Sequence, residues 1–127
     1  MKTKNIVMTN ANIYEYALGF KNKFQDAEML MPAAVSFSIV KNKKTLFTLA
    51  EDIERYRVDI LNKYHAVLND DRLSISPDNV EAVNKELEDL LNISQEVNIY
   101  TFSIEELKDV SLTSSQMESI LFMINEE

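Results

Sequence analysis

Carboxylates are the most numerous side chains in this chain that could do chemistry. The 127 residues include 21 Asp and Glu against 13 Lys and Arg. Eight of these carboxylates lie in three short groups: Asp70–Asp71, Glu86/Glu88/Asp89 and Glu105/Glu106/Asp109. Mg²⁺ and Ca²⁺ prefer oxygen ligands, but the spacing of these groups fits no calcium loop. Each group lies where a turn or the solvent-facing side of a helix would place it. We therefore predict no metal site.

Histidine, glycine and cysteine, which many nucleophilic and phosphate-binding sites need, are almost absent. The sequence has one histidine, His65, one glycine, Gly19, and no cysteine. A loop that binds phosphate needs several glycines, and a histidine base needs a serine or cysteine partner in a recognisable context. We expect His65 to follow a helix C-terminus, where a cation is favourable. We therefore predict a protein that is not an enzyme and has no cofactor.

The charge is distributed unevenly along the chain. Residues 1–65 have a net charge of +3 and residues 66–127 a net charge of −11, which together give −8. Direct binding to nucleic acid needs clustered cations, so an acidic chain argues against it. The acidic half is either a solvated surface or a face that meets a basic partner.

The composition is typical of one folded domain, which we predict to span residues 1–127. Hydrophobic residues make up 46% of the chain, and no run approaches the roughly 20 apolar residues of a membrane span. The absence of cysteine fits a reducing compartment. No secretion signal is visible, so we expect a cytoplasmic protein that does not enter the membrane.

A segment of thirty residues without glycine or proline, Val35–Tyr64, determines the expected fold. Its core positions follow a heptad spacing: Val35, Ile39, Asn42, Leu46, Leu49, Ile53, Tyr56 and Ile60. This pattern predicts a helix roughly 45–50 Å long in which Asn42 fixes the register. Because Phe37, Val40 and Phe47 widen the apolar stripe, we expect the helix to pack mostly against its own chain. A homodimer through Tyr56, Ile60 and Tyr64 is the alternative.

Shorter elements surround this helix in the sequence. We predict a strand at Asn5–Met8, a helix over residues 10–24 containing Gly19 at a close helix contact, and a strand at Arg72–Ser76. A helix capped by Ser76 should end near Asn92.

The last third of the chain begins with an expected strand over residues 96–103. Capping boxes at Ser103/Glu106 and Thr113/Gln116 then predict two more helices. The predicted fold class is α+β and mainly helical. One long central helix is packed by shorter helices, with a small sheet of two or three short strands.

The second half of the chain resembles an uncharacterised family of small proteins encoded by phages and prophages of Gram-positive bacteria. The similar residues are Asn84–Leu87 with Leu90–Leu91, Glu96–Val97, Ile104 with Leu107, Leu112, Met123–Ile124 and Glu126. The lysine-bearing long helix is also similar. The resemblance implies a phage origin, a small accessory role and a location in the host cytoplasm or the virion. It supplies no catalytic residues.

These observations predict a non-enzymatic phage accessory protein that binds another protein, as an assembly factor, chaperone or minor virion component. The alternative is an inhibitor of a host defence protein, whose acidic surface would imitate nucleic acid. The residues expected to bind the partner are Tyr56, Ile60, Tyr64, Glu86, Asp89, Glu105, Glu106 and Asp109.

Overall fold

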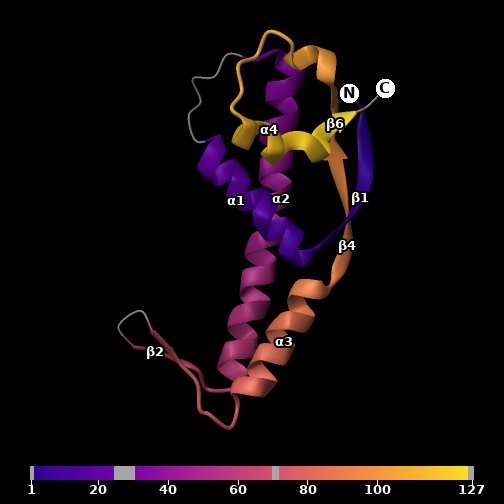
Figure 1. Cartoon of the computed structure of the whole chain (residues 1–127). Helices are drawn as coiled ribbons and strands as arrows, with labels where there is room; N and C mark the ends of the chain where they lie inside the picture. Colours follow the sequence, from indigo (N-terminus) through magenta and orange to yellow (C-terminus); the bar gives the residue numbers. More distant parts are fainter. Residues whose placement is uncertain (1, 25–30, 70–71, 126–127) are drawn as a thin grey trace.

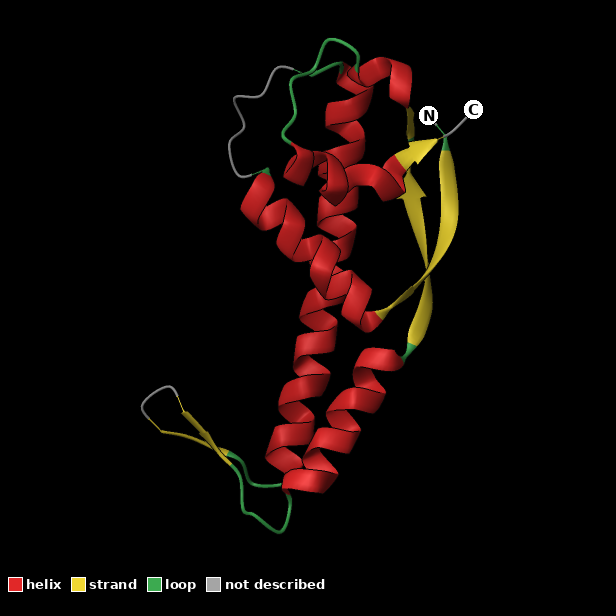
Figure 2. Cartoon of the chain, in the orientation of Figure 1, coloured by secondary structure: helices red, strands yellow, loops and turns green. Residues whose placement is uncertain are grey.

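The long helix α2 (Ala33–Lys63) forms the axis of the structure, a computed structural model that describes residues 2–24, 31–69 and 72–125. It is 31 residues long and begins after Pro32. The other helices pack along it, and small strand pairs lie beside them (Figure 1, Figure 2). The predicted fold class, α+β and mainly helical around one long helix, is confirmed.

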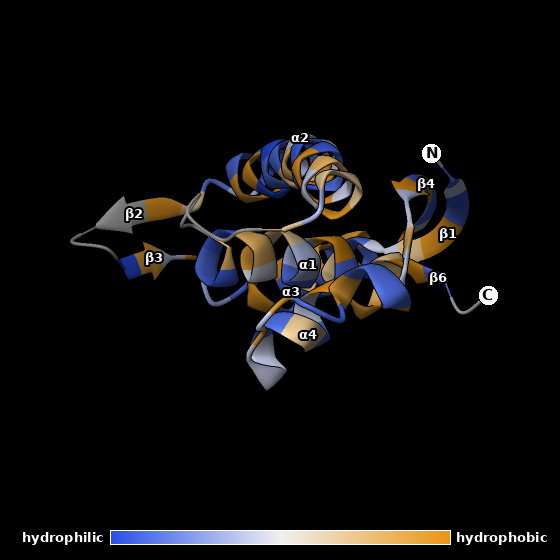
Figure 3. Ribbon diagram, turned by 90° about the horizontal axis from the view of Figure 1, so that it is seen from above, coloured by the Kyte–Doolittle hydropathy of each residue, from blue (hydrophilic) through white to orange (hydrophobic). Residues whose placement is uncertain are grey.

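Helix α1 (Asn10–Lys23) packs against α2, and the short helix α4 (Ser114–Ile120) packs on the other side of α1. Helix α1 begins at Thr9, whose Oγ1 accepts a hydrogen bond from the Asn12 amide at 3.1 Å. It lies between α2 and α4, as Figure 3 shows from above. A Cβ at Gly19 would lie 3.1 Å from Ser119 Oγ on α4. The predicted close helix contact at this glycine is therefore confirmed.

Helix α3 (Val80–Asn92) packs against the second half of α2 and runs back along it (Figure 1). The predicted cap at Ser76 was wrong, because the helix begins after Asn79. The Asn79 amide donates to the Ser76 carbonyl at 2.8 Å, which closes a turn over these four residues. Proline at the second position of a turn is as favourable as proline in a first helical turn, so Pro77 fits both.

The strands of the described residues form three separate pairs. Strand β1 (Thr3–Thr9) is antiparallel to β4 (Ser94–Tyr100), and β5 (Phe102–Ser103) is parallel to β6 (Ile124–Asn125). The strand predicted over residues 96–103 is thus divided at Thr101. Ser103/Glu106 and Thr113/Gln116 both form the predicted capping boxes, the first on a 3₁₀-helix, η1 (Ile104–Leu107). A second 3₁₀-helix, η2 (Leu121–Met123), precedes β6.

The third pair is a hairpin, of which the sequence predicted the second strand but not the first. Strand β2 (Val67–Asn69) pairs with β3 (Arg72–Ser74), and both project away from the helices (Figure 2). The residues predicted to make its turn chemistry, Asp70–Asp71, lie outside the described residues. Val67 and Leu73 are about half exposed, since the hairpin has no core beneath it.

The hydrophobic core occupies the end of the molecule where α1, α2, α4 and β4 meet. Its fully buried side chains are Ile13, Phe20, Val35, Leu46, Ile99, Ile120 and Met123. Beyond the contact of Tyr14 with Glu54, α2 packs chiefly against α3 among the described residues, so this end is a thin pair of helices (Figure 1).

Asn42 connects the long helix to the sheet. Its side chain is fully buried, and its amide Nδ2 donates to the Tyr100 carbonyl while its Oδ1 accepts from the Tyr100 amide, both at 2.9 Å. Alternate residues of an antiparallel strand point their backbone groups away from the partner strand. The Thr101 amide donates to Lys2, so those of Tyr100 point away from β1. The Asn42 side chain therefore makes the two hydrogen bonds at the open edge of β4 that a third strand would make.

Asn10 makes a second buried junction. Its Nδ2 donates to the Leu90 carbonyl at the end of α3, and its Oδ1 accepts from Gln95 on β4, both at 2.8 Å. Its backbone amide donates to the Ile93 carbonyl at 2.9 Å. The start of α1 is thereby joined to the passage from α3 into β4.

The end of α2 shows a left-handed residue. His65 has φ of 55°, its amide donates to the Asn62 carbonyl at 3.0 Å, and the Ala66 amide donates to the Leu61 carbonyl at 3.0 Å. These two bonds form a Schellman motif, in which the left-handed position usually holds glycine. His65 follows the helix C-terminus, as expected, but its role there is conformational.

We expect the Asn42→Ala substitution to lower the free energy of unfolding by about 3 kcal/mol, because it leaves the two Tyr100 backbone groups without partners. Asn98→Ala is the matched control on the same strand. Its amide donates to Asn5 at 2.8 Å in an exposed position, so its loss should change stability by roughly 0.5 kcal/mol or less. Urea denaturation of both variants measures this, and equal effects would contradict the assigned role of Asn42.

We expect the His65→Gly substitution to stabilise the fold by about 1 kcal/mol, because glycine adopts the left-handed conformation without steric strain. Asn62→Gly, three residues earlier and still inside the helix, should destabilise by roughly 0.5–1 kcal/mol. Thermal unfolding of the two variants should shift in opposite directions. A lower melting temperature for His65→Gly would show that the histidine side chain itself contributes.

Candidate protein-interaction site

Four of the predicted partner-binding residues line one groove between α2 and α3. Tyr56 and Ile60 come from α2, and Glu86 and Asp89 come from α3. The groove has a volume of about 340 Å³. The packing of the two helices brings together residues from the lysine-bearing and acidic halves of the sequence. Their role in partner binding stays a prediction.

The fifth predicted residue, Tyr64, lies at the edge of this groove beside an ion pair. Lys63 Nζ donates to Glu86 Oε1 at 2.9 Å. The hydroxyl of Tyr64, and then the Lys63 ammonium, lower the pKa of Glu86. The same carboxylate raises the pKa of Tyr64 and that of Lys63. Both partners of the pair are therefore charged at neutral pH.

The remaining three predicted residues lie far from this groove. Glu105 and Glu106 belong to η1 and Asp109 follows it, near the beginning of α2 (Figure 1). Glu106 Oε2 accepts a hydrogen bond from the Ser103 amide at 3.2 Å, so this carboxylate caps η1. The acidic residues expected to act together are thus divided between the two ends of the long helix.

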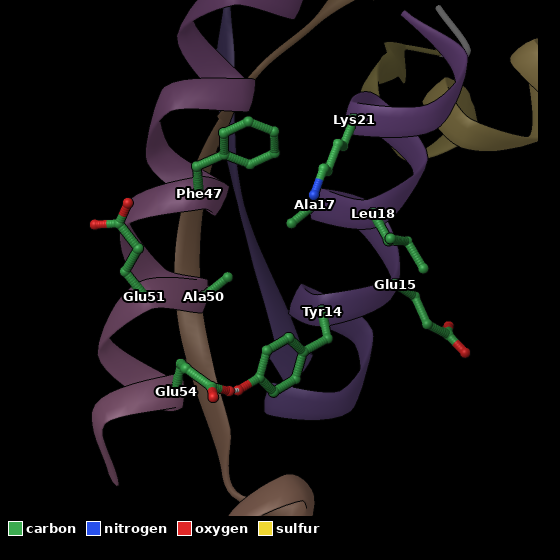
Figure 4. A pocket seen from close by; sticks show the side chains of 9 residues that line it. All are labelled: Tyr14, Glu15, Ala17, Leu18, Lys21, Phe47, Ala50, Glu51 and Glu54. Carbon is green, nitrogen blue, oxygen red and sulfur yellow. Dashed lines mark hydrogen bonds between the residues drawn. The ribbon is translucent and has the colours of Figure 1, made fainter. Parts of the chain in front are cut away.

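A larger groove lies between α1 and α2, and the sequence did not predict it (Figure 4). It has a volume of about 620 Å³ and an almost entirely apolar lining. Its residues are Tyr14, Glu15, Ala17, Leu18, Lys21, Phe47, Ala50, Glu51 and Glu54. Ala17 and Ala50 point toward one another across the gap, while Glu15 and Glu51 point outward from its two sides.

A hydrogen-bonded cluster closes one end of this groove. The Tyr14 hydroxyl donates to Glu54 Oε2 at 3.1 Å, and Arg57 Nε donates to the same oxygen at 2.9 Å. Arg57 Nη2 donates to Glu54 Oε1 at 2.6 Å. Burial, followed by the hydrogen bond to Glu54, raises the pKa of Tyr14 to about 12. Arg57 holds the pKa of Glu54 below its ordinary value. The cluster joins α1 to α2.

Periodicity did not identify this groove because its two walls come from different segments. In the sequence, Phe47 only widens the apolar stripe of the long helix. Leu18 is 56% exposed in the structure, but in the sequence it follows the core residue Ala17 without any distinguishing pattern. The sequence could have indicated this groove only through Leu18 and Phe47, because each is an apolar residue outside the main apolar stripe of its helix.

Within residues 2–24, 31–69 and 72–125, no group of three or more His, Asp or Glu side chains could hold a metal ion. No described helix is both long enough and apolar enough to cross a membrane. Comparisons with protein-family models, with curated proteins and with solved structures found no match.

We expect the hydrogen bond of Tyr14 to contribute about 1 kcal/mol to stability at neutral pH. Because the folded pKa is raised, this contribution is complete below the ordinary value of 10 and disappears as pH rises toward about 12. The free energies of unfolding of the Tyr14→Phe variant and of the parent protein, measured by denaturation across this pH range, should therefore converge.

An ultraviolet titration of tyrosine ionisation provides the control. The Tyr14→Phe variant should lose the component that titrates near pH 12, and Tyr56→Phe, at a position 62% exposed, should keep it. A Tyr14→Phe variant that differs from the parent by the same amount at every pH would contradict the assigned hydrogen bond.

Proposed function

We propose that this chain is a non-enzymatic accessory protein of a phage that acts by binding another protein, with the groove between α1 and α2 as the docking surface. The observation that carries the proposal is the open, almost wholly apolar groove of about 620 Å³. The phage origin rests on the resemblance of the second half of the chain.

The groove has the properties of a protein-docking surface. Leu18 on its rim is 56% exposed, and Phe47 and Ala50 are only partly buried. Exposing these apolar side chains to water is unfavourable, by roughly 25 cal/mol per Å² of apolar surface. Contiguous exposed apolar surface with charged residues around it is typical of interaction sites. Covering this groove would remove that unfavourable exposure.

An assembly factor, a chaperone and a minor virion component would all use such a surface. An inhibitor that imitates nucleic acid would instead need a continuous row of carboxylates. The acidic residues of α3 and those around η1 lie at opposite ends of α2, which supports the first group of functions over the second (Figure 1).

We expect Leu18→Asp to abolish capture of the partner when the tagged protein is used as bait in phage-infected cells, because it places a charge on the apolar wall. Leu121→Asp is the matched control, since Leu121 is 55% exposed on η2, away from the groove. It should capture as the parent does. Mass spectrometry then identifies which proteins Leu18→Asp loses.

Loss of virion proteins with Leu18→Asp alone would support the assembly role. Loss of a host defence protein would favour the inhibitor. Capture that survives Leu18→Asp but fails with Tyr56→Asp would move the docking surface to the groove between α2 and α3, where Tyr56 is 62% exposed.

A further inference from the structure

Strand β1 has one paired edge and one open edge. It pairs with β4 along seven residues without a bulge, and no other described strand pairs with it. In Figure 1 it runs along the outer side of the molecule. The open edge of a strand presents unpaired backbone N–H and C=O groups, which are a template for another strand. The chemistry of this edge therefore fits extended backbone.

The register identifies the backbone groups on the open edge. The Thr101 amide donates to the Lys2 carbonyl at 2.9 Å, so the even-numbered residues of β1 direct their backbone groups toward β4. Those of the odd-numbered residues Thr3, Asn5 and Val7 point the other way. The open edge therefore has the N–H and the C=O of each of these three residues.

Most of the usual protections of a sheet edge are missing from β1. The strand has no proline and no bulge, and Lys4 is its one charged residue. The outward residues Thr3, Asn5 and Val7 are uncharged. Val7 is 70% exposed, the highest value among the large hydrophobic side chains of the described residues. This edge is therefore chemically suited to receive a second strand.

A second copy of the chain fits the edge. Two antiparallel β1 strands related by a two-fold axis at Asn5 place Asn5 opposite Asn5 and Thr3 opposite Val7. The outward N–H and C=O groups from Thr3 to Val7 then all have partners, with two hydrogen bonds for each opposed pair. Lys4 lies opposite Ile6 of the other copy, so like charges do not face one another directly.

The side chains at the axis favour the same arrangement. Asn98 Nδ2 donates to Asn5 Oδ1 at 2.8 Å on the solvent-exposed side of the sheet. Asn5 Nδ2 bonds to no residue that the structure describes, so it is available to Asn5 of a second copy. The asparagines of the two copies would form one row across the joined sheet, and such rows stabilise stacked strands.

The start of α1 disfavours the neighbouring symmetric register. An axis at Val7 would place Thr3 opposite residue 11, which belongs to α1, whereas an axis at Asn5 keeps all the pairs between Thr3 and Val7. The joined sheet would have four strands, and sheets of three or more strands are more stable than a pair. Asn42 already bonds to the far edge of β4 in each copy.

We propose that the chain forms a two-fold symmetric homodimer through the open edge of β1, with Asn5 on the axis and one continuous sheet in the order β4-β1-β1-β4. An interface of one strand pair is small, so the dissociation constant should be roughly 1–100 μM, as in transient complexes. This inference does not depend on the groove between α1 and α2.

Light scattering of the pure chain over a concentration series tests the association. The mass should rise from 14.6 kDa toward twice that value. Val7→Pro removes an amide that points away from β4, so the chain should still fold while association weakens at least roughly tenfold. Val7→Thr keeps the amide and the branched side chain, so this matched control should associate as the parent does. Circular dichroism checks the folding of both variants.

Cysteine cross-linking tests the register without relying on Val7→Pro. The chain has no cysteine, so one substitution gives one thiol. Asn5→Cys should form an intermolecular disulfide on mild oxidation, because the Cα atoms of a hydrogen-bonded antiparallel pair lie about 5.5 Å apart. Asn98→Cys, one strand further from the axis, should stay unlinked. Val7→Cys should also stay unlinked, because Val7 lies opposite Thr3.

A chain that remains monomeric at roughly millimolar concentration would overturn the proposal. Association that Val7→Pro leaves unchanged would also overturn it. Cross-linking of Val7→Cys but not of Asn5→Cys would contradict the assigned axis. If Tyr56→Asp abolishes an association that Val7→Pro leaves intact, the chain dimerises through the long helix and not through β1.

Discussion

The fold depends on one buried side chain, the amide of Asn42, and its two hydrogen bonds to the backbone of Tyr100. Strands β1 and β4 form a sheet of only two strands, which is marginally stable on its own. Asn42 satisfies the open edge of β4 from the middle of the long helix, so the sheet becomes part of the helical core. An apolar residue at this heptad position would pack against α2's neighbours but would leave the Tyr100 groups without partners.

Asn10 repeats this arrangement where α1, α3 and β4 meet. The two asparagines lie on different helices, and each bonds to the backbone of a distant segment. Directional bonds of this kind specify where elements meet, which apolar contacts alone do less strictly. With α1 held at its start by Asn10 and along its length by α4, its other side remains beside α2 with the Tyr14–Glu54 bond at one end. The groove is the space left on that side.

Away from the core, the structure leaves apolar side chains exposed in the groove between α1 and α2. The groove has an almost entirely apolar lining, and charged side chains such as Glu15 and Lys21 lie around it. The thin pair of α2 and α3 and the projecting β2–β3 hairpin add further exposed surface at the opposite end of the molecule. Val83 of α3 and Leu61 of α2 are buried in this part of the molecule, so substitutions there should affect folding, whereas substitutions at the exposed Val67 and Leu73 of the hairpin should affect it less.

The sequence by itself determined the features that depend on neighbouring residues. Heptad spacing identified α2, two capping boxes marked η1 and α4, and the lone glycine marked a close helix contact. Each of these depends on contacts within one or two helical turns, or on an unusual residue type. The helix start predicted at Ser76 was wrong because Ser76 and Pro77 fit a turn as well as they fit the start of a helix. The hydrogen-bond partners of Asn42 and Tyr14 lie 58 and 40 residues away in the sequence. Only the tertiary structure could therefore identify these partners, and the same holds for the groove between α1 and α2.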